Sequence, residues 1–143
     1  MSYTGPLMEI KKLNSSVYDE LPLAWIAEKS YNSTPNQRLD TSKSSMDRTG
    51  VLHREVLSHT RSKIEFELRA NTNVGIAQFN AFMSEHYTNS AQRRFYLRYY
   101  DQETDGYKTG EFYMPDPTYN IKNIDYANKV IRYNTVRIAF IEY

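Results

Sequence analysis

A period-two pattern of side chains is the feature that most constrains this chain, and it recurs in three stretches, strictly in the first of them. In "RSKIEFELRA", Ile64, Phe66 and Leu68 alternate with charged residues. The stretches "RRFYLRYY" and "VRIAFIEY" repeat the pattern. Period-two alternation is typical of strands with one buried face. Because both faces of "VRIAFIEY" carry apolar residues, this strand is predicted to be central or covered on both sides.

Turn signals predict how some of these strands are joined. Asp105-Gly106 is a tight-turn pair that predicts a hairpin between "RRFYLRYY" and a return strand ending near Met114, before Pro115 and Pro117. Shorter strands are predicted at 7–10 and within "GVLHREVLSH", with "SHTR" as the turn before the next strand. Residues 118–130 are predicted to be a loop with short local structure, followed by one long strand over 129–143.

One helix is predicted, at about residues 72–87. Asn71 to Asn73 can cap its start, and Ile76, Phe79, Met83 and either His86 or Tyr87 recur at helical spacing. Such a stripe favours a helix face packed on a sheet over a ligand site.

The first third of the chain lacks a clear core pattern. Residues 30–49 are rich in Ser, Thr, Asn and Asp, which favour loops. We therefore predict a single domain over 1–143, with an extended arm and loops over 1–49 and a core over 50–143. The expected fold is mainly β (α+β), an antiparallel β-sandwich with one flanking helix and a long N-terminal arm.

Composition restricts the function classes. The net charge is +1 and there is no cysteine, which argues against a nucleic-acid binder working by bulk charge and against thiol chemistry. No apolar run approaches a membrane span or a signal peptide, so we expect no membrane partner and synthesis in the cytoplasm.

Catalytic and metal-binding patterns are missing as well. The histidines, His53, His59 and His86, have no metal-ligand spacing, and Glu65 and Glu67 are expected to be solvated. No phosphate loop or nucleophile motif occurs. The sequence therefore predicts no enzyme, no cofactor and no metal.

The 13 Tyr, 6 Phe and 1 Trp suit either a tyrosine-lined sheet or an assembly surface. Basic and aromatic residues mix in "RRFYLRYY", which fits cross-strand or intersubunit contacts better than single-stranded nucleic acid. A carbohydrate-binding face at Trp25, Tyr96 and Tyr100 is the alternative. The candidate interface residues are Trp25, Tyr31, Tyr96, Arg98, Tyr100, Tyr113 and Tyr119.

Residues 47–143 resemble small tail proteins of siphophages and prophages from Gram-positive bacteria. The stretches "DRTGVLHREVLSHTRSKIEFEL", "FYLRYYDQETDGYKTGEFYMPDPTYNI" and the terminal "VRIAFIEY" carry the resemblance. It implies a fold similar to tail-tube and distal-tail modules, at the tail tip, baseplate or tube.

The resemblance also implies the partners. The chain would form a ring with itself, six copies being our guess, and would contact other tail proteins and, passively, the DNA in the channel. Neighbours would complete sheet edges and arms. Two roles are alternatives to a structural tail subunit: a carbohydrate-binding host-recognition module, and a tail-assembly accessory protein absent from the finished particle.

Overall fold

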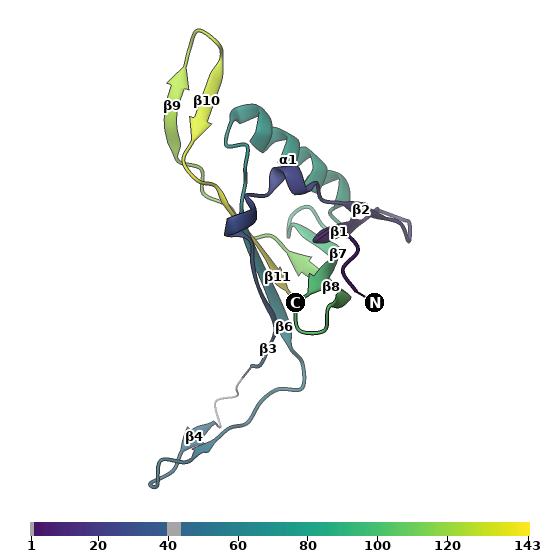
Figure 1. Cartoon of the computed structure of the whole chain (residues 1–143), viewed down its shortest axis with the longest axis vertical. Helices are drawn as coiled ribbons and strands as arrows, with labels where there is room; N and C mark the ends of the chain where they lie inside the picture. Colours follow the sequence, from purple (N-terminus) through teal and green to yellow (C-terminus); the bar gives the residue numbers. More distant parts are fainter. Residues whose placement is uncertain (1, 40–43) are drawn as a thin grey trace.

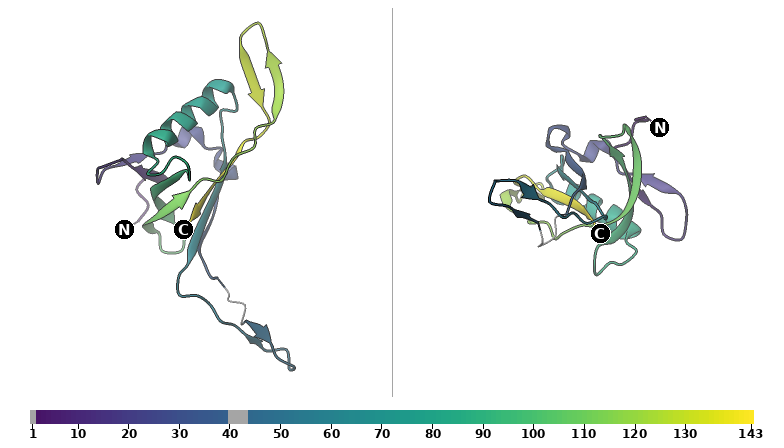
Figure 2. Two further views of the ribbon diagram at one scale, coloured as in Figure 1. Left: turned by 180° about the vertical axis from the view of Figure 1, so that it is seen from behind. Right: turned by 90° about the horizontal axis from the view of Figure 1, so that it is seen from below.

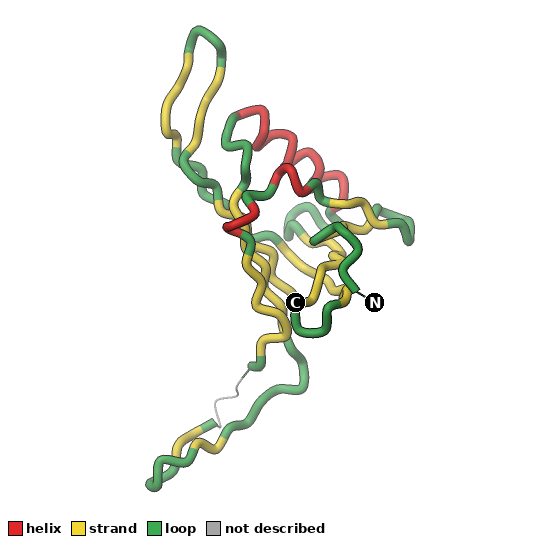
Figure 3. The backbone as a smooth tube through the Cα atoms, in the orientation of Figure 1, coloured by secondary structure: helices red, strands yellow, loops and turns green. Residues whose placement is uncertain are grey.

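A computed structural model describes residues 2–39 and 44–143. It is mainly β, with one large antiparallel sheet of seven strands, two small two-stranded sheets and a single α-helix among the described residues (Figures 1 and 3). The large sheet has the order β2-β1-β7-β8-β11-β6-β3. Its strands are β2 (Tyr18–Glu20), β1 (Met8–Lys11), β7 (Arg94–Asp101), β8 (Gly106–Tyr113), β11 (Arg137–Glu142), β6 (Arg61–Glu67) and β3 (Asn32–Gln37).

The predicted hairpin and the predicted central strand are both confirmed. β7 and β8 pair in register from Arg94 opposite Tyr113 to Asp101 opposite Gly106. β11 lies between β8 and β6, with Phe140 opposite Ile64. The alternation in the sequence corresponds to burial of every second residue in β6 and β7.

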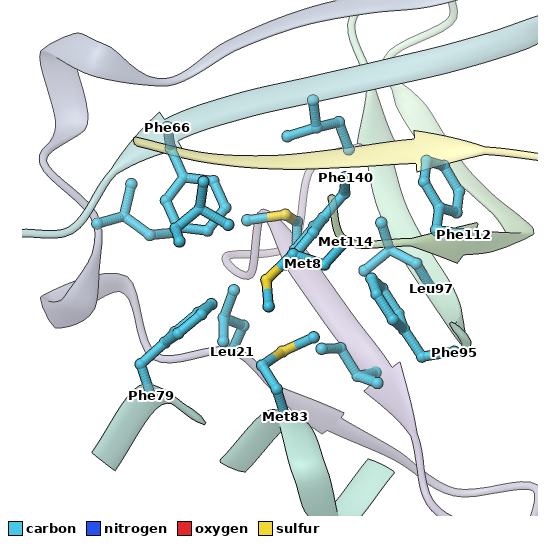
Figure 4. Close-up of a cluster of buried hydrophobic side chains, with 14 of the residues drawn as sticks. Met8, Leu21, Phe66, Phe79, Met83, Phe95, Leu97, Phe112, Met114 and Phe140 are labelled. Atoms are coloured by element: carbon cyan, nitrogen blue, oxygen red, sulfur yellow. The ribbon is translucent and has the colours of Figure 1, made fainter. Parts of the chain in front are cut away.

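The core lies between this sheet and the helix α1 (Asn73–His86) (Figure 4). The predicted inward residues of the strands are buried, and the helix buries Ile76, Phe79, Met83 and His86. Thr72 caps the helix by accepting a hydrogen bond from the Gly75 amide at 3.2 Å. The predicted helix stripe is therefore confirmed, with His86 as its last member.

The prediction of an arm over residues 1–49 is wrong for most of this segment. β1, β2, the short 3₁₀ helices η1 (Leu23–Trp25) and η2 (Glu28–Ser30), and β3 all belong to the body of the molecule. β3 has the polar sequence "NSTPNQ" and is a strand because it pairs with the edge of β6, for example Asn32 with Glu65. Pairing at an edge overrides a composition that favours loops.

The sandwich was also a wrong prediction, because the main strands form one continuous hydrogen-bonded sheet. The sheet curves, so that its inner face and α1 enclose the core together (Figure 2). The predicted strand "GVLHREVLSH" contributes only β5 (Leu52–His53), which pairs with β4 (Ser45–Met46) outside the large sheet. The predicted turn "SHTR" therefore does not join β5 to a neighbouring strand.

The structure differs from the prediction in two segments, the predicted loop at 118–130 and the predicted long last strand. β9 (Ile121–Asp125) and β10 (Val130–Tyr133) pair as a separate hairpin. The chain then changes direction at residues 134–136 before β11 enters the large sheet. The last predicted strand is thus two strands with different partners.

Candidate interaction surfaces

Two hairpins project from the body at opposite ends of the long axis of the molecule (Figure 1). From here on, the arm means residues 44–59, which contain β4 and β5, and no longer the predicted N-terminal segment. We call residues 121–133, which contain β9 and β10, the upper hairpin. Both extend beyond the large sheet in two views that differ by half a turn (Figures 1 and 2).

The tip of the arm is a turn organised by the side chain of Asp47. Its Oδ1 accepts hydrogen bonds from the amides of Thr49 at 2.9 Å and Val51 at 3.0 Å, and Oδ2 lies 2.9 Å from Nε2 of His53. Gly50 takes a φ of +84°, which favours glycine. Hydrogen bonds, first from the Thr49 hydroxyl and then from His53, lower the pKa of Asp47 to about 2. The tip therefore has a defined shape although it is exposed.

The base of the arm is fixed by main-chain contacts. The Leu57 amide donates to the carbonyl of Leu39 at 2.8 Å. Ser44 Oγ accepts from the amide of Glu55 at 2.8 Å and donates to the same residue's carbonyl at 3.0 Å. Where the arm joins the body, His59 Nε2 lies 2.7 Å from the main-chain oxygen of Tyr143. The contacts of Leu57 and Ser44 join the two sides of the base to each other, and the contact of His59 joins the arm to the residue after β11.

The arm exposes apolar side chains that the core does not use. Met46 is 66% exposed, and Val51, Leu52 and Leu57 are each more than half exposed. Val56 is exposed as well. The exposed apolar side chains make the arm a candidate interaction surface.

The upper hairpin also exposes large apolar side chains. Tyr126 at its turn is 81% exposed, and Ile121 and Ile124 are more than half exposed. A hollow of about 250 Å³ lies on it, lined mainly by apolar groups. The lining residues are Asn73, Ile124, Asp125, Tyr126, Lys129, Val130 and Ile131.

The upper hairpin is joined to the start of α1 by hydrogen bonds. The amide of Ile131 donates to Asn73 Oδ1 at 3.2 Å, and the amide of Tyr133 donates to the carbonyl of Asn71 at 2.8 Å. The hollow is therefore held against the first turn of the helix.

The edges of the large sheet offer little to a partner strand. β2 has three residues, and β3 contains Pro35 and an irregularity in register between Thr34 and Gln37. Short edges, proline and bulges all oppose pairing with another chain. The expectation that neighbours complete these edges is therefore less favoured than contact through the two hairpins.

Comparison with known proteins places the chain in a family. A family model described as "Family of unknown function (DUF6711)" matches residues 1–143. The chain belongs to this family. No curated protein matches it. The resemblance to phage tail proteins is not addressed by these findings and stays a prediction for this DUF6711 chain.

Three of the predicted interface residues share the outer face of β7. Tyr96 is 39% exposed, with Lys11 Nζ 5.1 Å from the centre of its ring. Arg98 donates to both carboxylate oxygens of Glu9, at 3.1 and 2.9 Å. Tyr100 is half-buried and donates its hydroxyl hydrogen to Asp105 at 2.9 Å. These three side chains lie on one face of β7, and intramolecular partners already hold much of it.

The other four predicted residues are dispersed. The Trp25 ring packs edge-on against Phe82 of α1 at 5.5 Å, so it serves the core. Tyr31 is half-buried, and burial raises the pKa of its hydroxyl. Tyr113 packs against the Tyr143 ring on the outer side of the sheet, at 5.1 Å. Tyr119 is 38% exposed, near the base of the upper hairpin.

The sequence reasoning missed the apolar residues of both projections. Met46 and Leu52 on the arm, and Ile121 and Ile124 on the upper hairpin, lie in strands of two to five residues, and Tyr126 lies in the turn that follows β9. The available signal was an apolar residue in a polar segment that no predicted core pattern explained.

The described residues contain no group of three or more His, Asp or Glu arranged to hold a metal ion. His53 and His86 each contact one aspartate, Asp47 and Asp19 respectively. Within the described ranges no helix is long and apolar enough to span a bilayer. The features that remain to be explained are the two projections.

Proposed function

We propose that this chain is a structural subunit of a phage tail, in a ring at the tail tip, the baseplate or the tube, and that it acts by self-assembly and by contact with other tail proteins. The observation that supports the proposal is the pair of hairpins with exposed apolar side chains at opposite ends of the molecule. The resemblance of residues 47–143 supports the phage setting. The proposal needs no catalytic residue and no cofactor.

The exposed apolar side chains make self-assembly a physical expectation. Burial of apolar surface stabilises association by about 25 cal/mol per Å², and an isolated two-stranded hairpin is marginally stable in water. A partner that covers Met46 and Leu52 would therefore stabilise the arm as well as the contact.

Light scattering coupled to size-exclusion chromatography tests self-assembly. We expect oligomers of the wild-type chain at micromolar to millimolar concentration, and their loss in Leu52→Glu. The matched control is Leu13→Glu, because Leu13 is 47% exposed on the turn between β1 and β2, away from both projections. A strictly monomeric wild-type chain over this range would refute self-assembly.

Mass spectrometry of purified phage particles tests the location. Peptides of this chain in the particle, in multiple copies, are expected for a tail subunit. A chain required for tail formation but absent from the particle would instead be an assembly accessory protein.

A carbohydrate-binding role is the second candidate, and one observation favours it. The exposed Tyr96 ring borders a hollow of about 340 Å³ that Lys11, Lys12 and Leu13 also line. Binding to a cell-wall glycan array that disappears in Tyr96→Ala would support this role. Equal binding of wild type and Tyr96→Ala would contradict it.

A further inference from the structure

We infer that the arm of one copy seats in the hollow on the upper hairpin of the next copy, which gives a head-to-tail contact. This inference rests on the proposed self-assembly and specifies which surfaces meet. It concerns the apolar tip of the arm, represented by Met46 and Leu52, and the apolar lining represented by Ile124, Tyr126 and Val130.

The two surfaces cannot meet within one chain. The arm and the upper hairpin extend in opposite directions from the body, and the large sheet lies between them (Figures 1 and 2). Their bases are also fixed, by the bond from the Leu57 amide to the Leu39 carbonyl and by the bond from the Tyr133 amide to the Asn71 carbonyl. Each apolar surface can therefore be covered only by another molecule, and a second copy brings the missing surface.

The shapes suit this pairing. The arm presents a convex tip with a turn held by Asp47, and the upper hairpin presents a hollow of about 250 Å³. Met46 lies opposite Leu52 in the pairing of β4 with β5, so the two residues are cross-strand neighbours. A small apolar projection thus faces a small apolar hollow.

Charge favours the head-to-tail contact over contacts between like surfaces. In the arm, Asp47 and Glu55 balance Arg48 and Arg54. In the upper hairpin, three basic residues, Lys122, Lys129 and Arg132, stand against one acid, Asp125. Two upper hairpins in contact would repel each other, because like charges would face across the interface.

An arm on an upper hairpin avoids that repulsion. It sets a surface with balanced charges, including the ionised Asp47, against a basic one. An arm against an arm would join two surfaces of balanced charge, which gives no electrostatic attraction between them. In the heterologous pairing, the basic upper hairpin contacts the arm and does not contact another basic upper hairpin.

A heterologous contact leaves one arm and one upper hairpin unoccupied at the ends of any open chain of copies. Such contacts close into a ring where the rotation per copy allows it, and otherwise continue as a filament. The inferred contact therefore generates rings or filaments, and a closed dimer only where two antiparallel copies each seat an arm on the other's upper hairpin.

The absence of cysteine from the natural chain allows a direct test by cross-linking. Leu52→Cys and Ile124→Cys are made separately in the full-length protein, one with an affinity tag so that the mixed dimer migrates separately in a gel. Both positions are exposed, so folding is retained, which circular dichroism checks. The two proteins are oxidised alone and after mixing at equal concentration.

We expect the mixed dimer to exceed either homodimer at least tenfold, and a chain carrying both substitutions to give a ladder of larger species. The matched control mixes Leu13→Cys with Ile124→Cys and is expected to give only background dimer. A majority of Leu52→Cys homodimer would overturn the inference in favour of an arm-to-arm contact. Equal yields in the test and control mixtures would overturn it as well.

Size-exclusion chromatography of the same samples separates this inference from the proposed function. Oligomers without the mixed cross-link would refute the head-to-tail contact and leave self-assembly standing. Strictly monomeric protein throughout would refute both.

Discussion

The contact between His86 and Asp19 leads to a quantitative prediction. His86 is buried in the last turn of α1, with Nδ1 2.7 Å from the carbonyl oxygen of Phe82 and Nε2 2.7 Å from Oδ2 of Asp19 on β2. The two ring nitrogens of His86 therefore join the end of α1 to β2.

The perturbation is Asp19→Asn, which keeps the shape of the side chain and removes its charge. A hydrogen bond to a charged group contributes about 1.5–3 kcal/mol and a neutral one about 0.5–1.5 kcal/mol. The Asp19 side chain is 33% exposed, so water screens part of the difference. We therefore expect a loss of about 1 kcal/mol in the free energy of unfolding at pH 7, or about 3 °C in Tm.

The pH dependence follows from the pKa of Asp19. The hydrogen bond from His86 lowers this pKa in the folded protein below its ordinary value of 3.8, and the charge of Lys12 at 3.5 Å adds to the effect. The stabilisation is therefore present above about pH 4 and is lost as the pH falls through the lowered pKa. We expect the difference between wild type and Asp19→Asn to shrink as the pH is lowered from 5 toward 2.

Urea unfolding followed by the fluorescence of Trp25 measures this, because its ring packs on α1 beside Phe82. The control is Asp116→Asn, since Asp116 is 93% exposed and lies 3.8 Å from Arg93. We expect the control to change the free energy by less than about 0.5 kcal/mol. A loss in Asp19→Asn no larger than in the control, or one that is constant from pH 7 to pH 2, would refute the reasoning.

Three further predictions concern the arm and the core. The folded-state pKa of Asp47 is lowered to about 2, so its turn is stabilised above about pH 4 and loses this stabilisation near pH 2; the amide NMR shift of Val51 should titrate there. Gly110→Ala places its Cβ 2.4 Å from Oε2 of Glu142, and chemical denaturation should show a loss of about 1 kcal/mol as that carboxylate moves. Phe140→Ala empties a fully buried position and should cost about 3–5 kcal/mol in the same assay. A titration midpoint near pH 4, or substitutions without effect, would contradict these arguments.

The sequence predicted those parts of the fold in which burial repeats along the chain. Ile64, Phe66 and Phe140 alternate with polar residues because a buried sheet face requires it, and Phe79 and Met83 recur at helical spacing because one helix face is buried. The elements that these residues mark, β6, β11 and α1, were all predicted. Where many side chains enter one core, the pattern is strong enough to see.

The elements that were not predicted bury little. β3 is polar, and only its partner β6 makes it a strand. β4 and β9 expose most of their side chains, so no periodicity marks them. The division between β10 and β11 was missed because an apolar run does not reveal which strands it pairs with.

The candidate site was missed for a related reason. The tyrosine content favoured an interaction surface on the outer face of β7, where Tyr96 and Arg98 lie. The exposed apolar residues of the projections, such as Leu52 and Ile124, are recognised only once the fold shows that the core does not bury them.

The central position of β11 has a consequence for folding kinetics. In the order of the large sheet, β6 and β3 are connected to the other four strands through β11 alone. The β11 contacts with β6 and β8 join residues far apart in the sequence, such as Phe140 with Ile64. Loops must close before such pairs form, which slows folding. Pairing of β11 therefore joins the two parts of the sheet, and we expect it to be slower than formation of the local hairpin between β7 and β8.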